Sequence, residues 1–577
     1  MEKITYSLSV VLWATLLFLL NYTNSYLFFT LEQNQLLVYS WPYFLKEIFY
    51  QPGGPIQFIG AFVIQFFRFP YMGEAFTSLF LAATWLLTVF IGRRIAPKAI
   101  LYILAFVPVF FLLLLHLDFN YNYTGTLSFV LTLAFFLGYT GITRYAIRTL
   151  AGAITIPVLY WAIGPVSCFF AFYILIWEIL HRTPKSYRSF LVWIESLGLA
   201  AVGFYLLWTP NFNNVFFYSG IEALPIRFYL PWISFALFLP VVWLLRRWTP
   251  KKRYVIALHT GLQMACIVLL AWQGIFKTVD LNSLYLMKYD FHTQHQQWHR
   301  IVSTSKGPQN SYFRLCYLNL ALAEEGVLAE QGFRFDQKGI QGLVTQWNGE
   351  VVSSALLSDI YFAQGNIGMA QAMAFESNIN SMFGGKPRML QRLVQTNLIY
   401  GAWPIAEKYL NVLEKTLYYK DWAKEQKRFL YNDAAVEADP LLGEKRKNLI
   451  PDNHLSGPWD PRIDLQAIAA HHPQNKVAVE YLGMAHLLSK NLTAFKEFLK
   501  EYYPPHSALP AAFQEAFLLC YEEEPERWSD YALSPPLLER FKSYNDFLEK
   551  NHTNTSFPQM AYRSYGDTYW YYNMFKM

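Results

Sequence analysis

The chain has 577 residues, of which 54% are hydrophobic, 18% aromatic and 15% charged, whereas an average soluble domain is about 25% charged. Residues 1–272 contain 17 Lys and Arg against 8 Asp and Glu, and residues 273–577 contain 30 against 33, so the net charge of +6 joins a basic apolar half to a slightly acidic half. Because the basic residues lie beside apolar runs, where they set membrane orientation, the high pI is no argument for nucleic-acid binding, and no nucleic-acid partner is expected.

The first half of the chain contains nine apolar runs that are long enough to cross a bilayer as helices. The first run follows Lys3 closely and ends without a small-residue cleavage site, so we expect it to remain as a membrane anchor. The nine runs are 7–29, 73–92, 98–116, 123–142, 147–163, 165–181, 189–209, 228–245 and 254–273.

Basic residues in the gaps between these runs predict the orientation. With Lys3 inside, 14 of the 17 Lys and Arg fall in inner gaps, and only Lys46, Arg68 and Arg227 are outside. Counting residues 55–67 as a further crossing would turn 13 basic residues outward, against the positive-inside bias. We therefore predict a transmembrane domain over residues 1–273 with nine helices, an inside N-terminus and a first outer loop, 30–72, that forms two interfacial helices. The location would be the bacterial inner membrane.

Residues 274–577 then lie outside, which in a bacterium is the periplasm, and their pattern is helical. Residues 356–375 and 393–413 each place a Gly between two apolar helices, followed by Ala and an aromatic residue. This resembles the tetratricopeptide hairpin, in which small residues let paired helices approach. The sequence predicts an all-α protein with a periplasmic helical-repeat domain of six to nine helical pairs. An unrelated all-α domain is the alternative.

Two smaller features of the second half also carry expectations. The tail, 562–577, is rich in aromatic residues, and we expect this surface to be covered by the repeat groove or the membrane interface. These residues include Tyr565, Tyr569, Trp570, Tyr571, Tyr572 and Phe575. The four cysteines stand singly in apolar stretches, which predicts buried small side chains rather than a metal site or a disulfide framework.

Two acids follow apolar runs on the outer side. Glu32 comes directly after the first run and Asp118 after the third, with His116 and Tyr121 beside Asp118. Acids near a bilayer are costly without a task or a partner, and such a pair could supply a general base and an anchor for substrate hydroxyls or a divalent metal. The alternative is that Glu32 caps an interfacial helix and Asp118 is a solvated loop acid. No metal-ligand set is predicted.

The predicted arrangement resembles the membrane-integral glycosyltransferases of the C-type fold. It shares with them an inside N-terminus and a long first outer loop with two interfacial helices. Glu32 stands at the start of that loop, and Asp118 lies in the next outer loop. The resemblance covers about residues 1–210 and is architectural: the first-loop acid is Glu rather than Asp, and no Asp-x-Asp or Trp-Trp-Asp signature is present. It implies a transferase that takes a sugar from a polyprenyl phosphate carrier, with Glu32 and Asp118 as catalytic acids. The whole chain also resembles an uncharacterised bacterial family of multi-pass membrane proteins with C-terminal helical repeats.

A lipid-linked phosphate would need a cation on the outer side. Arg227 and Arg68 are the candidates, although either could anchor lipid headgroups instead; His116 and Tyr121 complete the predicted substrate-binding residues. The sequence therefore predicts a polyprenyl-phosphate-dependent glycosyl transferase for envelope glycans, with the bilayer and a lipid-linked sugar as partners. A competing hypothesis is a non-catalytic scaffold whose repeat domain recruits an envelope protein. Glu195, inside the seventh run, keeps a transporter as a minor alternative.

Overall fold

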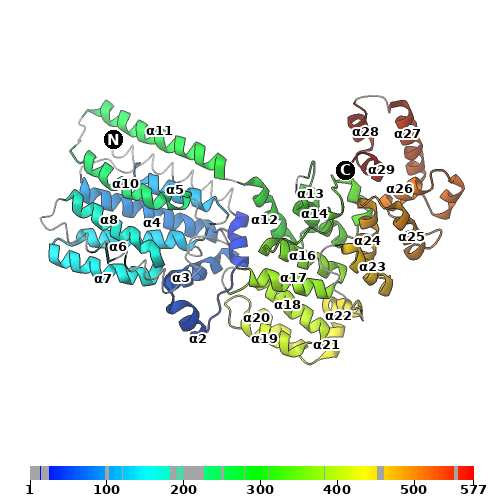
Figure 1. Ribbon diagram of the computed structural model, residues 1–577, viewed down its shortest axis with the longest axis horizontal. Coiled ribbons are helices and arrows are strands. Elements are labelled where there is room, and N and C mark those ends of the chain that lie inside the picture. Colours follow the sequence, from blue (N-terminus) through cyan, green and yellow to red (C-terminus); the bar gives the residue numbers. More distant parts are fainter. Residues whose placement is uncertain are drawn as a thin grey trace. The chain divides into compact units, whose positions relative to one another are not determined.

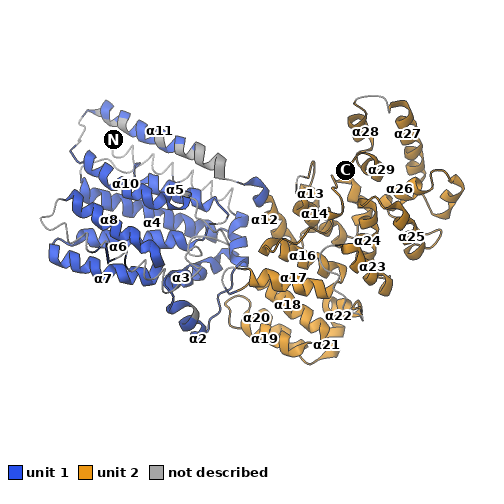
Figure 2. Cartoon of the chain, viewed as in Figure 1, with its two compact units in different colours: residues 1–284, 382–384 blue, residues 285–381, 385–577 orange. Residues whose placement is uncertain are grey.

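The computed structural model is all-helical and divides into two compact units (Figures 1 and 2). Unit 1 comprises Met1–Leu284 with Met382–Gly384, and unit 2 comprises Tyr285–Ser381 with Gly385–Met577. The structure describes residue 13 and residues 25–576, with gaps at 98–102, 120, 182–191, 193, 196–197, 199–225, 248–251, 279, 310, 382–383, 451–459 and 552–555. The predicted all-α class is confirmed, since the described residues contain no β-strand.

Unit 1 is built mainly of apolar helices that pack side by side. Four stretches of the described residues are long and apolar enough to cross a membrane: Met72–Ile95, Thr124–Gly141, Tyr145–Leu180 and Arg227–Leu245. The elements are α2 Trp41–Tyr43, η1 Phe44–Phe49, α3 Gly54–Ile64, η2 Gln65–Arg68, α4 Met72–Ile95, α5 Phe106–His116, α6 Thr124–Gly141, α7 Tyr145–Ile163, η3 Gly164–Val166, α8 Ser167–Leu180, η5 Ile226–Tyr229, α10 Leu230–Leu245 and α11 Arg253–Thr278.

These four stretches cover only part of the predicted nine crossings. The stretch Tyr145–Leu180 joins two predicted runs, because α7 and α8 form a hairpin that turns at Gly164, whose φ is +72°. The predicted run 98–116 contains the 11-residue α5, and the run 254–273 lies within the 26-residue α11. Most of the runs 7–29 and 189–209 falls outside the described residues, although Glu195 itself is described, as a helical residue with an exposed side chain. A nine-helix bundle therefore stays a prediction.

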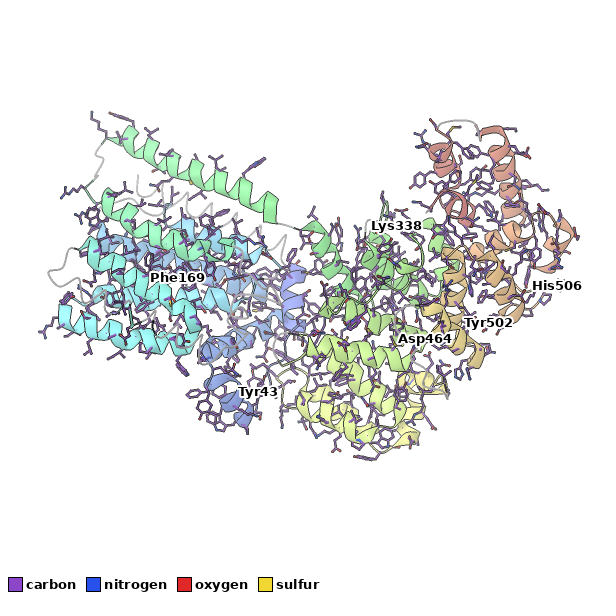
Figure 3. The ribbon with its side chains drawn as sticks, in the orientation of Figure 1. Tyr43, Phe169, Lys338, Asp464, Tyr502 and His506 are labelled. Carbon is purple, nitrogen blue, oxygen red and sulfur yellow. The ribbon has the colours of Figure 1, made fainter. Side chains whose placement is uncertain are left out.

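Hydroxyl residues line the contact between α4 and α6. Thr84 and Thr88 of α4 and Ser128 and Thr132 of α6 are buried, and each hydroxyl donates to the carbonyl four residues earlier in its own helix. Small side chains that satisfy their own polar groups let apolar helices approach closely, as membrane helices require. Aromatic rings fill the contact between α8 and α10, where Phe169 stacks on Trp232 at 5.1 Å between centroids (Figure 3).

The first outer loop of the prediction packs on one end of this bundle. α3 has 11 residues, about 16 Å of helix, which is too short to cross about 30 Å of hydrocarbon. It lies against α6 and α7, and a Cβ at Gly60 would come within 2.5 Å of the Thr124 methyl. The Trp161 indole donates to the Phe49 carbonyl at 2.8 Å, which ties the loop to the end of α7.

Basic residues hold the opposite end of the bundle. Arg94 at the end of α4 donates to the Leu137 carbonyl near the end of α6, at 2.7 Å. Arg148 of α7 forms a two-pronged ion pair with Glu178 of α8, with N–O distances of 2.6 and 2.9 Å, and Glu178 also accepts from the Tyr139 hydroxyl at 2.9 Å. Both partners of this pair are buried, so the pair fixes α7 against α8.

Unit 2 is a succession of short helices, many of them in antiparallel pairs. Its elements are α12 Leu281–Gln294, which begins in unit 1, α13 Trp298–Thr304, α14 Tyr312–Glu324, α15 Leu328–Gln331, η6 Gly332–Arg334, η7 Ile340–Gly342, α16 Val351–Gln364, α17 Ile367–Ile379, α18 Pro387–Tyr400, α19 Trp403–Leu413, α20 Lys420–Gln426, η8 Lys427–Phe429, α21 Asp433–Ala438, α22 Pro440–Lys447, α23 Pro461–His471, α24 Lys476–Leu488, α25 Leu492–Tyr502, α26 Ala511–Cys520, η9 Pro525–Asp530, α27 Pro535–Asn551, α28 Phe557–Tyr565 and α29 Tyr569–Phe575.

The glycines that the sequence places between helices lie at the turns of two hairpins. Gly365 ends α16 with φ +88°, and Gly401 ends α18 with φ +73°, a left-handed conformation that glycine adopts at little cost. Asn366 then caps α17 through its side chain, and this same side chain donates to Asp464 of α23 (Figure 3). The paired helices are therefore observed, whereas a tetratricopeptide repeat stays a prediction.

The aromatic tail is covered within unit 2. Tyr569, Trp570 and Tyr572 of α29 are buried, and the Trp570 indole donates to the Glu515 carbonyl at 2.8 Å. Tyr572 donates to the Leu488 carbonyl at 2.8 Å. Cys316 is a buried free thiol, as expected, whereas the free thiols of Cys168 and Cys520 are only partly buried.

Candidate functional site

The predicted residues around Asp118 gather in the loop between α5 and α6. His116 is the last residue of α5, and its Nε2 lies 2.8 Å from the Thr126 hydroxyl. The same hydroxyl lies 3.1 Å from that of Tyr121, and the rings of His116 and Tyr121 meet edge to face at 5.3 Å. Burial raises the pKa of Tyr121, so its hydroxyl stays protonated at neutral pH.

Gly125 makes this close packing sterically feasible. A Cβ at this position would lie 2.6 Å from the Tyr121 hydroxyl oxygen and 3.1 Å from its ring. Any larger residue would therefore push Tyr121 away from Thr126. The loop thus combines a buried imidazole, a phenol and a hydroxyl in one fixed arrangement.

Asp118 and Arg227 form an ion pair. The Asp118 Oδ2 and the Arg227 Nη2 are 2.7 Å apart, the Asp118 side chain is 7% exposed and the Arg227 side chain is 49% exposed. Arg227 also lies 5.4 Å from the centroid of the Phe228 ring, and that ring is 6.1 Å from the Tyr121 ring. The pair therefore joins η5, the short helix directly before α10, to the loop after α5, although the two residues are more than a hundred positions apart.

Glu32 lies at the end of a helical segment, residues 25–33, and is 3% exposed. Its Oε2 accepts from the Gln33 amide at 2.6 Å. Asn34 is also buried, and neither its amide nitrogen nor its amide oxygen has a hydrogen-bond partner among the described residues. Three consecutive buried polar side chains at the end of an apolar helix are costly, so this segment is a functional candidate.

Aromatic contacts connect the Glu32 segment to the Asp118 loop. The Phe28 ring, one helical turn before Glu32, meets the Phe67 ring of η2 at 5.2 Å. Phe67 meets the Tyr123 ring at 5.2 Å, and Tyr123 lies 5.4 Å from the His116 ring. Arg68 follows Phe67 at the end of η2, with an exposed side chain. Asp118, Arg227, His116 and Tyr121 thus form one cluster, named here the outer cluster, and Glu32 is placed on a helix that reaches it through two rings.

Sequence reasoning missed several members of this region. Thr126, which joins His116 to Tyr121, has no signal of its own in an apolar helix. Phe67 carried a weak signal, because it ends the interfacial helix next to Arg68. The pair of Arg148 with Glu178 could have been found from opposite charges near the same end of two neighbouring predicted helices.

Metal-binding groups are not evident in the described part of the chain, where no three His, Cys, Asp or Glu residues are grouped to hold a metal ion. His292, which stands in a helical row with His295 and His299 in the sequence, instead places its Nδ1 2.9 Å from the Gln297 side-chain oxygen. A divalent metal at the outer cluster stays a prediction.

Fold and site together define a membrane protein with an apolar helical bundle and a second, polar helical unit. The chain belongs to a family of unknown function, DUF6057, whose model matches residues 2–576. No curated protein and no solved structure matches the chain. The family covers both units, so the bundle and the polar unit belong together in its members.

Proposed function

We propose that this protein is a polyprenyl-phosphate-dependent transferase of a glycosyl or related group, acting at the outer face of the bacterial inner membrane in cell-envelope glycan assembly. The observation that carries the proposal is the ion pair between buried Asp118 and half-exposed Arg227. A guanidinium has five donors in a planar fork, of which the carboxylate occupies only some. Among the described residues, Arg227 is therefore held in position by one carboxylate and has donors left for a phosphate, which it would bind by charge-assisted hydrogen bonds.

The remaining residues of the outer cluster receive roles by their chemistry. Glu32 would accept the proton of the acceptor hydroxyl while that oxygen bonds to the sugar C1 and the C1–O bond to the lipid phosphate breaks. The bonding electrons go to the phosphate oxygen, and the leaving lipid phosphate stays bound to Arg227. His116 and Tyr121 would hydrogen-bond the donor sugar. Asp118 would act as a positioning residue that holds Arg227, rather than as the anchor for an acceptor.

The orientation of the protein is part of the proposal. We infer nine crossings, a cytoplasmic N-terminus and a periplasmic unit 2. Support comes from the two ends of the bundle: Arg94 and Arg148 are at one end, and Asp118 and Arg227 are at the other. The orientation is tested by labelling intact cells with a membrane-impermeant maleimide. Each variant carries one cysteine, at exposed position 50, 143 or 523, in a chain whose four native cysteines have been replaced. Labelling at 50 and 523 but not at 143 is expected, and labelling at 143 would overturn the orientation.

The transferase is tested by complementing a deletion strain of the source organism and measuring lipid-linked and finished envelope glycans by mass spectrometry. Glu32→Gln and Arg227→Gln should lower the product per amount of membrane-inserted protein at least a hundredfold and leave the lipid-linked donor to accumulate. Lys46→Gln is the matched control, because Lys46 is an exposed loop cation outside the outer cluster. Normal glycan in both Glu32→Gln and Arg227→Gln would refute the transferase.

The same pair also supports a second candidate, a membrane-anchored scaffold. Asp118 has an arginine partner, and Glu32 accepts a hydrogen bond from the neighbouring Gln33 amide. Both acids could therefore have a structural role in holding the loops together. In that case unit 2 would recruit an envelope protein. A photoreactive residue at position 523 should then capture one protein partner in cells, and Glu32→Gln and Arg227→Gln should leave the capture and the phenotype unchanged.

A further inference from the structure

Unit 2 contains a pocket of about 430 Å³. Its wall is formed by side chains from α12 and α13, from α14, α16 and α18, and from α20, α22 and α24. Small-molecule sites in proteins occupy roughly 300–1,000 Å³. The pocket therefore has room for a ligand of several rings, and it is separate from the outer cluster of unit 1.

Ion pairs neutralise one side of the wall. Arg388 bridges two acids, with its Nη1 2.8 Å from Asp290 and its Nη2 in contact with Asp359. Arg392 reaches the other oxygen of Asp359 at 3.1 Å. Two guanidinium groups thus face two carboxylates, and an anionic ligand would find no excess positive charge from these arginines.

Lys445, the third cation of the wall, is similarly engaged. Its Nζ donates to the Ala363 carbonyl at 3.1 Å and lies 3.5 Å from a carboxylate oxygen of Glu444. The exposed carboxylate of Glu324 also lines the pocket. Asp290 does not itself line the pocket, so the lining charges balance: the cations are Arg388, Arg392 and Lys445, and the acids are Asp359, Glu324 and Glu444. This balance disfavours both a phosphate and an ammonium as the preferred ligand.

Uncommitted hydrogen-bonding groups remain in this neutral wall. The Arg392 Nε is buried and has no hydrogen-bond partner among the described residues. The Gln391 amide and the Glu324 carboxylate line the pocket with it, so donors and acceptors are mixed. A buried donor without a partner costs about 1–3 kcal/mol, so a ligand hydroxyl that accepts from Arg392 would relieve this cost.

Aromatic surface completes the pocket. Trp298 of α13 and Trp422 of α20 line it and are partly exposed. The face of Phe362 is already covered, since the Arg392 guanidinium lies 3.6 Å from its centroid. The two indole rings are therefore the aromatic faces on which a ligand ring can stack.

We propose that this pocket binds a neutral saccharide. Each sugar hydroxyl both donates and accepts, which matches a wall that mixes amide, carboxylate and guanidinium groups with balanced charge. The apolar C–H face of a sugar ring suits stacking on Trp298 or Trp422, whereas a lipid tail would leave the polar groups of the wall without partners. The inference goes beyond the proposed transferase, since it concerns unit 2 and a binding event that needs no lipid-linked donor.

Binding is tested on the full chain in lipid nanodiscs, because sugar-based detergents would compete. The probes are four neutral tetrasaccharides, namely cellotetraose, maltotetraose, chitotetraose and mannotetraose, measured by isothermal titration and saturation-transfer NMR. At least one should bind, and Trp422→Ala and Gln391→Ala should each weaken its Kd at least tenfold. Trp347→Ala is the matched control, since Trp347 is a 40% exposed indole of unit 2 outside the pocket.

Three outcomes would overturn the inference. One is the absence of binding by all four probes to a chain whose thermal unfolding is normal. Another is equal loss of affinity in Trp347→Ala, which would place the site elsewhere. The third is a preference for a phosphorylated sugar or an acidic peptide, with an affinity that falls steeply between 50 and 500 mM salt, as charge recognition requires. Glu32→Gln should leave saccharide binding intact, so this test stands apart from that of the transferase.

Discussion

Replacing Arg227 should destabilise the protein more than replacing Asp118, although both changes break the same ion pair. The reason is the unequal burial of the partners: the Asp118 side chain is 7% exposed and that of Arg227 is 49% exposed. Arg227→Ala leaves a buried carboxylate without its cation. Asp118→Asn leaves a guanidinium that water can solvate, and it preserves the shape of the buried side chain.

The expected magnitudes follow from this difference. A buried acceptor that loses its partner costs about 1–3 kcal/mol, and more for a charge, whereas a pair with one solvated member contributes about 0–1 kcal/mol. Arg227→Ala should therefore cost roughly 2 kcal/mol more than Asp118→Asn. At about 2–4 °C for each kcal/mol in a unit of this size, the two Tm values should differ by roughly 4–8 °C.

Thermal unfolding of the full chain in one detergent, followed by tryptophan fluorescence, measures the difference. Arg68→Ala is the matched control, because it removes an exposed arginine near the same end of the bundle, and its Tm should change by less than about 2 °C. A Tm for Asp118→Asn that is equal to or below that of Arg227→Ala would refute the argument from burial. The double variant Arg227→Ala/Asp118→Asn should recover most of the loss, since the buried charge is then absent.

Three further predictions concern other parts of the molecule. Arg148→Met and Glu178→Gln should each lower the free energy of unfolding by about 3–5 kcal/mol, because both partners are buried. A double-mutant cycle in detergent should give a coupling energy above about 1 kcal/mol, and simple additivity of the two effects would contradict the prediction. Gly125→Ala should displace Tyr121 and lower the Tm by several degrees, because its Cβ would lie 2.6 Å from the phenol oxygen; an unchanged Tm would contradict the packing. Burial raises the pKa of Glu515 to about 8. Between about pH 5 and pH 8 the folded protein therefore keeps a proton on Glu515, whereas the unfolded chain has released it near pH 4.5. The free energy of unfolding should fall by up to about 1.4 kcal/mol per pH unit over this range. Urea titrations should show this slope in the wild type and a reduced slope in Glu515→Gln, and equal slopes would contradict it.

Local signals in the sequence were sufficient for the helical turns of unit 2. Gly365 and Gly401 lie where a left-handed residue ends a helix, and the next helix begins within two residues. These signals depend only on neighbouring positions, because a turn needs its own backbone conformation whatever packs on it. The short α3 could be anticipated for a similar reason, since its length and the preceding Pro and Gly residues are local properties.

Contacts between helices of unit 1 could not be predicted in the same way. A soluble helix shows its inward side by an apolar stripe, but a membrane helix is apolar on all sides, so the pattern does not fix its rotation about its axis. His116 and Thr126 meet only because α5 and α6 have particular rotations, and Arg148 meets Glu178 for the same reason. The positive-inside bias places a residue at one end of the bundle but does not choose its partner.

The pocket of unit 2 lacked a sequence signal for a different reason. Its lining runs from residue 293 to residue 477, and no two of its key residues form a motif. His292, His295 and His299 are spaced along one helical face in the sequence, yet the His292 Nδ1 lies 2.9 Å from the Gln297 side-chain oxygen. The lining residues come mainly from eight separate helices, so they meet only through the packing of the helices and not through their spacing in the sequence.

The cations at the two ends of unit 1 differ in how their donors are used, and this difference is the strongest reason to place function at the outer cluster. Arg148 directs donors to Glu178 and to the Ile142 carbonyl, and its side chain is only 10% exposed. Arg94 donates to the Leu137 carbonyl and the Thr140 hydroxyl. Arg227 instead forms, among the described residues, an ion pair with Asp118 at 2.7 Å between Nη2 and Oδ2, and its side chain is 49% exposed. A cation that is oriented by a buried acid and still reaches solvent can exchange water for a phosphate without breaking the fold, whereas Arg148 could do so only by leaving Glu178 buried and unpaired.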